Sequence, residues 1–102
     1  MGNFRFRRIV EQAASHYEIT AQEVLSKRRH QPVVSARHLA MWLVRNALNL
    51  SLQETAEYFG MAHHTTALHA LRKVEVHQAK CPVFAHRCAA LLAGCRSPDP
   101  SP

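Results

Sequence analysis

Apolar residues recur along much of this chain at intervals of three and four positions, the spacing that gathers them on one face of an α-helix. The pattern covers residues 6–17, 35–49, 63–79 and 83–92, and shorter helical stretches follow Thr20 and Ser51. No run alternates between apolar and polar positions as a half-buried strand does. The sequence therefore predicts an all-α fold, a compact bundle of about six helices.

The expected core consists of the positions that face inward on these helices. In the three long stretches they are Phe6, Val10, Ala13 and Tyr17; Ala36, Leu39, Ala40, Leu43, Ala47 and Leu50; and Ala67, Ala70, Leu71 and Val74. The short helix after residue 20 is expected to add Val24 and Leu25. A different stripe of the helix over 35–49, made of Arg37, Met41 and Arg45, is expected to face the solvent.

Polar residues mark where several helices begin and end. Thr20 and Glu23 have the spacing of a capping box, and so do Ser51 and Glu54; in this motif each side chain satisfies a free backbone N–H at the helix start. Ser35 is a favourable N-cap for the third helix. The fourth helix is expected to end near Phe59, because the following Gly60 suits the left-handed conformation that closes a helix.

Two segments lack helical periodicity. Residues 27–32 read Lys-Arg-Arg-His-Gln-Pro, which predicts a basic loop broken by proline. Residues 95–102 are rich in serine and proline, and we expect them to form a disordered tail after a single domain over residues 1–94. Neither an internal repeat nor a glycine-rich phosphate loop is present.

The charge of the chain favours a polyanionic partner. The 102 residues include 13 Lys and Arg against 7 Asp and Glu, a formal net charge of +6, and 8 His can add to it below neutral pH. Each phosphate that a basic surface neutralises releases condensed counterions, which favours binding to nucleic acid. Many small proteins are basic without such a role, so charge alone leaves both interpretations open.

No apolar run approaches the ~20 residues that span a bilayer, and no signal-peptide pattern opens the chain. We therefore expect a cytoplasmic protein, associated with the nucleoid, that does not bind membranes. Cys81, Cys88 and Cys95 are spaced seven apart without a CxxC pair, and an odd count argues against a disulfide framework. A zinc site with His77 is conceivable, but unpaired ligand spacing favours buried thiols, so we predict no metal and no cofactor. The cysteine face could also support self-association.

The most informative unit is the capped fourth helix, the turn at Gly60 and the helix over 63–79. Two helices joined by a tight glycine turn form a helix-turn-helix, and the second helix of such a motif lies in the DNA major groove. The residues expected to meet base edges are His63, His64, Thr65 and Thr66. Helix-turn-helix geometry also occurs in bundles that do not bind DNA, so the motif by itself does not decide the function.

The amino-acid sequence of the motif is more specific than its geometry. Residues 60–70 read Gly-Met-Ala-His-His-Thr-Thr-Ala-Leu-His-Ala, and Arg-Lys-Val-Glu follows at 72–75. This stretch closely resembles the C-terminal DNA-binding domain of the bacterial replication initiator DnaA, whose usual pattern reads Gly-Gly-Arg-Asp-His-Thr-Thr-Val-x-His-Ala. The resemblance extends upstream to residues 25–29, 36–41 and 50–52 and covers about residues 8–92.

The resemblance implies three sets of contacts with duplex DNA. His64 and Thr65 would meet bases, with Thr66 on a phosphate or an adjacent base. The implied phosphate contacts are Arg37, His38, Arg45 and Lys73, and the implied loop contacts are Arg28, Arg29 and Gln31. For Arg37 and Arg45 a solvated surface charge is the alternative, and His69 could equally be a packed structural histidine.

Four positions depart from the family pattern. Ala62 and His63 stand where the family has Arg and Asp, so a helix cap and a base-reading acceptor are lost. Gln31 falls where an arginine would enter the minor groove, and His38 replaces a glutamine. The resemblance thus implies that DNA binding is retained with an altered or relaxed sequence preference.

These features together predict a DNA-binding protein rather than an enzyme. The chain has no nucleophile, base and orienting group in a recognisable arrangement, and no phosphate loop for ATP. We expect a stand-alone regulator or accessory factor of replication initiation or transcription, acting on initiator-like sites. Two alternatives remain: an adaptor that binds a replication initiator or a related ATPase, and a detached domain of a longer initiator.

Overall fold

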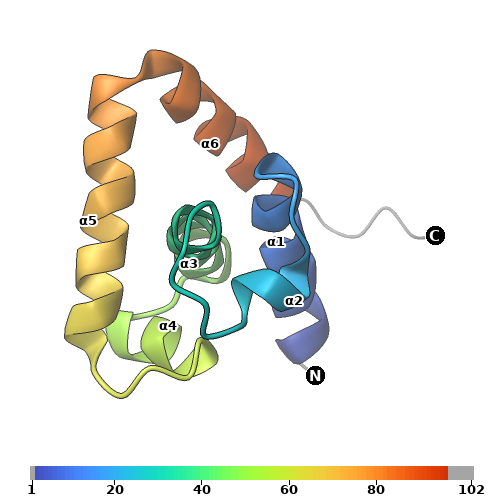
Figure 1. Cartoon of the computed structure of the whole chain (residues 1–102), viewed down its shortest axis with the longest axis vertical. Coiled ribbons are helices and arrows are strands. Elements are labelled where there is room, and N and C mark those ends of the chain that lie inside the picture. Colours follow the sequence, from blue (N-terminus) through green and yellow to red (C-terminus); the bar gives the residue numbers. More distant parts are fainter. Residues whose placement is uncertain (1, 97–102) are drawn as a thin grey trace.

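The computed structural model describes residues 2–96, with side chains from residue 4 onward. Its helices are α1 (Gly2–His16), α2 (Ala21–Val24), α3 (Val33–Leu48), α4 (Leu52–Tyr58), α5 (His64–Lys80) and α6 (Pro82–Arg96) (Figure 1). No strand occurs within residues 2–96. The predicted all-α bundle of about six helices is confirmed.

Helix α3 lies at the centre of the bundle. In Figure 1 it is seen end-on, with the long helix α5 on one side, α1 on the other, α6 above and α4 below. Because neighbours cover α3 on several sides, its buried positions are not confined to one stripe: they are Val33, Ala36, Leu39, Ala40, Met41, Leu43, Val44 and Ala47. The predicted solvent-facing stripe is therefore wrong for Met41, which is 0% exposed, while Arg37 and Arg45 are half-buried.

The buried side chains form two clusters. The larger one joins α1, α2, α3, α5 and α6 and contains most of the predicted core, with Tyr17 and Leu50 packed against it as partly buried residues. The smaller one joins α3, α4 and α5 and consists of Met41, Ala56, Ala67, Ala70 and Leu71. Leu25 was predicted to face inward and is 38% exposed, because α2 ends at Val24 and its buried residues are Ala21 and Val24.

Both predicted capping boxes are formed. The Thr20 hydroxyl accepts from the backbone N–H of Glu23 at 3.1 Å, and the Glu23 carboxylate accepts from the backbone N–H of Thr20 at 3.1 Å. Ser51 and Glu54 make the same pair of bonds at 3.0 and 2.9 Å. Sequence spacing alone therefore located the starts of α2 and α4.

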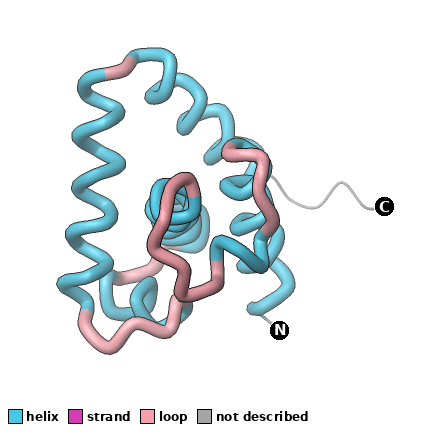
Figure 2. Tube along the Cα trace, in the orientation of Figure 1, coloured by secondary structure: helices cyan, strands magenta, loops and turns pink. Residues whose placement is uncertain are grey.

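The start of α3 differs from the prediction. The helix begins at Val33, so Ser35 lies inside its first turn and is not the N-cap. The side-chain oxygen of Gln31 instead accepts hydrogen bonds from the backbone N–H of Ser35 at 3.1 Å and from its hydroxyl at 2.8 Å. Gln31 thus supplies the capping interaction from the loop between α2 and α3, which Figure 2 shows crossing in front of α3.

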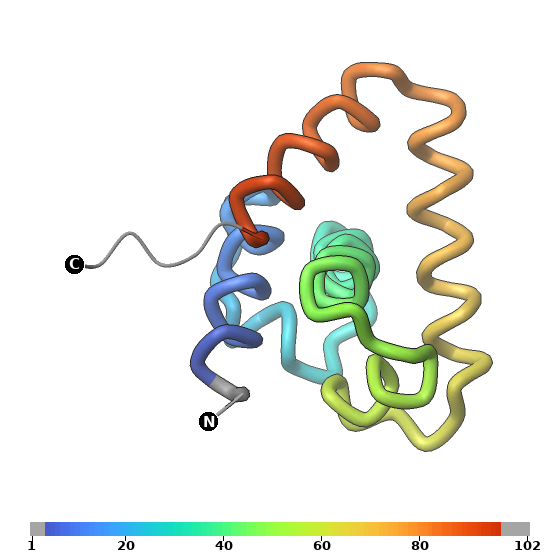
Figure 3. The backbone as a smooth tube through the Cα atoms, turned by 180° about the vertical axis from the view of Figure 1, so that it is seen from behind, coloured from blue at the N-terminus to red at the C-terminus, as the bar shows by residue number. Residues whose placement is uncertain are grey.

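The turn between α4 and α5 has the predicted glycine geometry. Gly60 adopts φ = 69°, its N–H donates to Glu57 O at 3.1 Å, and the N–H of Met61 donates to Ala56 O at 2.8 Å. These two bonds form a Schellman motif, which closes α4 and redirects the chain. Figure 3 shows the result from behind, with α4 below α3 and α5 rising beside both. The helix-turn-helix is therefore present.

Helix α6 is longer than predicted and continues through Arg96. Cys88 and Cys95 on this helix are buried in the larger cluster, and burial raises the pKa of both thiols. Packing of α6 accounts for the positions of Cys88 and Cys95, while Cys81, at the end of α5, packs against the same cluster as a partly buried residue. The tail was predicted to begin at residue 95, but Cys95 and Arg96 belong to α6. The rest of the predicted tail, residues 97–102, lies outside the described residues. Across residues 2–96, no helix is long and apolar enough to cross a membrane.

Candidate nucleic-acid interface

The start of α5 presents a polar surface. Its inward face packs through Ala67, Ala70 and Leu71 against the smaller cluster, so the residues before them point away from the bundle. The predicted base-reading residues, His63, His64, Thr65 and Thr66, are all exposed. The first turn of the second helix of the motif is thus free to approach a partner, as a major-groove reader must be.

His63 is the N-cap residue of α5 but its side chain makes no cap hydrogen bond. Its backbone is extended (φ −129°, ψ 139°), and its carbonyl accepts from the N–H of Thr66 at 3.2 Å. A side-chain oxygen at this position would satisfy one of the free N–H groups of the first turn. The expected loss of a cap at this position is confirmed.

Arg37 donates hydrogen bonds to three backbone carbonyls that the sequence did not predict. Its Nε donates to Val24 O at 2.9 Å, and its Nη2 donates to Ser26 O at 2.6 Å and to Arg28 O at 2.9 Å. The side chain is half-buried, and burial lowers the pKa of Arg37. Arg37 therefore ties the backbone of the α2–α3 loop to α3. No local pattern could reveal this, because the carbonyl partners lie 9–13 residues earlier in the chain.

The loop that Arg37 holds displays two arginines. Arg28 and Arg29 are both exposed, and Arg28 Nη1 lies 3.8 Å from the Glu23 carboxylate in a largely exposed ion pair. Such a pair contributes about 0–1 kcal/mol and leaves the guanidinium able to exchange partners. Gln31 is less free, because its side-chain oxygen already accepts from Ser35.

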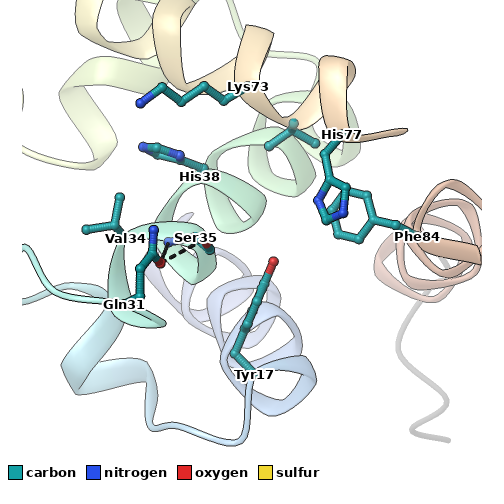
Figure 4. A pocket seen from close by; sticks show the side chains of 9 residues that line it. Tyr17, Gln31, Val34, Ser35, His38, Lys73, His77 and Phe84 are labelled. Carbon is teal, nitrogen blue, oxygen red and sulfur yellow. Dashed lines mark hydrogen bonds between the residues drawn. The ribbon is translucent and has the colours of Figure 1, made fainter. Parts of the chain in front are cut away.

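His38, Lys73 and Gln31 come together at a pocket between α3 and α5. The pocket has a volume of about 140 Å³, and Tyr17, His77 and Phe84 line its other side (Figure 4). The pKa of His38 is lowered, first by burial and then by the positive charges of Lys73 and Arg37. The sequence predicted His38 and Lys73 as members of one surface but did not predict that Tyr17, His77 and Phe84 would line the same pocket. These three residues reach it from the turn after α1, from α5 and from α6.

Two further predicted residues lie apart from this pocket. Arg45 is half-buried in the last turn of α3, where a positive charge interacts favourably with the helix dipole. Its Nε is buried, and no hydrogen-bond partner for it exists in the described part of the chain. His69 is exposed, which rules out the alternative of a packed structural histidine.

This arrangement defines a helix-turn-helix protein: an exposed first turn on α5, a glycine turn behind it and a basic loop tied to the central helix. The model of the family described as bacterial dnaA protein helix-turn-helix matches residues 6–74. The chain belongs to this DnaA helix-turn-helix family.

Individual relatives agree with the family. The chromosomal replication initiator protein DnaA of Aquifex aeolicus (strain VF5) is 37% identical over 82 residues, 80% of this chain and 21% of the relative. That of Bartonella quintana (strain Toulouse) is 42% identical over 71 residues, 70% of this chain and 14% of the relative. A crystal structure of a DNA replication initiation factor has a TM-score of 0.79 and 33% identity, covering 90% of this chain and 28% of that chain. The chain therefore spans about a fifth or less of these curated relatives.

Proposed function

We propose that this chain binds duplex DNA through the α4–α5 helix-turn-helix and acts as a regulator or accessory factor of replication initiation or transcription. The observation that carries the proposal is the exposed first turn of α5, placed on a member of the DnaA helix-turn-helix family. In this geometry the residues at 63–66 enter the major groove while α4 crosses the backbone. Association with the nucleoid follows from such binding.

The proposed contact residues divide into readers and phosphate contacts. His63, His64, Thr65 and Thr66 read base edges or hold an adjacent phosphate. The backbone contacts are His38, Arg45 and Lys73 on the helices and Arg28 and Arg29 on the loop. Arg37 contributes mainly through the loop, because its guanidinium already donates to three carbonyls.

The sequence preference differs from that of the relatives named as initiators. His63 offers no side-chain acceptor in place of the family's aspartate, and Ala62 offers no charge in place of its arginine. Gln31 cannot supply the positive charge that favours a narrow minor groove, and its amide oxygen is engaged by Ser35. Duplex binding with relaxed or altered discrimination is the expected outcome.

Fluorescence anisotropy on a duplex with an initiator-type box and on a scrambled duplex, at one fixed salt concentration, tests the proposal. Thr65→Ala should cost about 1–3 kcal/mol on the preferred site and little on the scrambled one. Lys73→Ala should weaken both duplexes about equally and reduce the slope of log K against log salt by about one unit. Equal losses for Thr65→Ala on the two duplexes would argue against sequence reading and favour the adaptor for a replication ATPase.

A further inference from the structure

The pocket between α3 and α5 holds polar groups that the reading turn of α5 does not use. The hydroxyl of Tyr17 points into the space between His38 and His77, and the nitrogen-bearing ends of His38 and Lys73 lie side by side at the far edge (Figure 4). These four side chains come from α3, α5 and the turn after α1, yet they converge on one pocket of about 140 Å³. The hydroxyl of Tyr17 and the imidazole of His77 can each donate a hydrogen bond at neutral pH.

The charged groups that line this pocket are all of one sign. None of its nine lining residues, all within the described part of the chain, carries a carboxylate. The positive charges of Lys73, which lines the pocket, and of the nearby Arg37 both disfavour the charged form of His38. Burial raises the pKa of Tyr17, which keeps its hydroxyl protonated and able to donate. An anion in the pocket would relieve the repulsion and accept from every one of these donors.

The walls limit what can enter. The His77 ring stacks on Phe84 with centroids 3.9 Å apart and an interplanar angle of 12°, which fixes the imidazole at one side of the pocket. Val34 and Val74 supply apolar wall. The pocket opens to solvent, and its volume of about 140 Å³ has room for an anion the size of phosphate.

We propose that this pocket binds a small free phosphate-bearing anion, with Tyr17 and His77 as donors on one side and His38 and Lys73 as donors on the other. Tyr17 and His77 belong to this site alone, since neither is among the proposed DNA contacts. The anion site therefore does not rest on DNA binding. Because His38 and Lys73 are shared with the proposed DNA surface, an occupied pocket also competes with duplex for these two side chains.

Titration of the full chain with inorganic phosphate, followed by two-dimensional NMR against sodium chloride of equal ionic strength, tests the site. Phosphate should shift the resonances of Tyr17 and His77 with saturation, and chloride should not. Tyr17→Phe, which keeps the ring and removes only the hydroxyl, should weaken phosphate binding about tenfold, because hydrogen bonds to charged groups are the stronger ones. His77→Gln should have a similar effect, whereas Lys80→Ala, an exposed lysine of α5 outside the pocket, should have none.

DNA binding measured on the same variants separates the two proposals. Tyr17→Phe should bind duplex with unchanged affinity, and phosphate should displace duplex from the wild type more effectively than from this variant. Phosphate binding without duplex binding would leave the pocket proposal standing and overturn the proposed function. Shifts at Tyr17 and His77 that only duplex produces, or phosphate shifts spread evenly over the surface lysines and unchanged in Tyr17→Phe, would overturn the pocket proposal.

Discussion

Replacement of Arg37 by alanine tests whether this residue holds the loop or contacts phosphate directly. The substitution removes three hydrogen bonds to the carbonyls of Val24, Ser26 and Arg28. At a net contribution of about 1 kcal/mol each, their loss amounts to about 3 kcal/mol. Two of the three bonds are part-buried and the third is exposed, so water compensates for only part of the loss. We therefore expect a decrease in unfolding free energy of about 2 kcal/mol, measured by urea denaturation.

The same substitution should affect DNA binding more than the removal of one charge does. Without the anchor, Arg28 and Arg29 lose their fixed position, so the salt slope should fall by about two units rather than one. Arg37→Lys should recover only part of the stability, because an ammonium cannot match the planar guanidinium. Arg87→Ala, an exposed arginine of α6, is the control and should change stability by less than about 0.5 kcal/mol. Unchanged stability of Arg37→Ala together with a one-unit fall in slope would refute the anchoring role.

Two further substitutions and a change of pH test other parts of the structure. Gly60→Ala should lower the unfolding free energy by about 1 kcal/mol and the melting temperature with it. The cost arises from backbone strain at φ = 69°, because no neighbouring atom would contact the added Cβ. His63→Asp should raise stability by about 1 kcal/mol by capping α5, and anisotropy should show greater discrimination for an initiator-type box; unchanged stability would mean that the turn does not need the cap. The lowered pKa of His38 means that the unfolded chain takes up the proton first, so the contribution of His38 to stability is complete above pH ~6.5 and is lost below it. A neighbouring phosphate raises that pKa, so duplex affinity should increase as pH falls below ~6.5, and His38→Ala should remove this part of the response.

Local patterns predicted those parts of the fold that local interactions determine. The capping boxes at Thr20 and Ser51 and the left-handed Gly60 involve residues at most five apart, and each formed as expected. The start of α3 was misplaced because Ser35 looks like an N-cap in sequence, whereas Gln31 takes that role from four residues upstream. A propensity for capping does not show which of two nearby polar side chains will reach the helix.

Features that depend on tertiary contacts could not be predicted from sequence patterns. Met41 was expected on the surface because arginines flank it at four-residue spacing, and only the placement of α4 and α5 against α3 explains its burial. The exposed start of α5 was predictable, since its inward residues follow the helical period. The anchoring of the loop by Arg37, and the convergence of Tyr17 and His77 on one pocket, join segments from distant parts of the chain and leave no periodic signal.

The smaller cluster beneath the helix-turn-helix has a consequence for motion. Three of its five buried members, Ala56, Ala67 and Ala70, are alanines, which allow α4 and α5 to approach closely but bury little apolar surface. The larger apolar side chains of α4 and the turn after it, Leu52, Phe59 and Met61, are only partly buried. Local opening of a segment costs less where few large side chains pack. The backbone amides of α4 should therefore exchange with solvent hydrogen faster than those of α3, and a bound partner would slow that exchange by ordering a unit that the bundle holds only loosely.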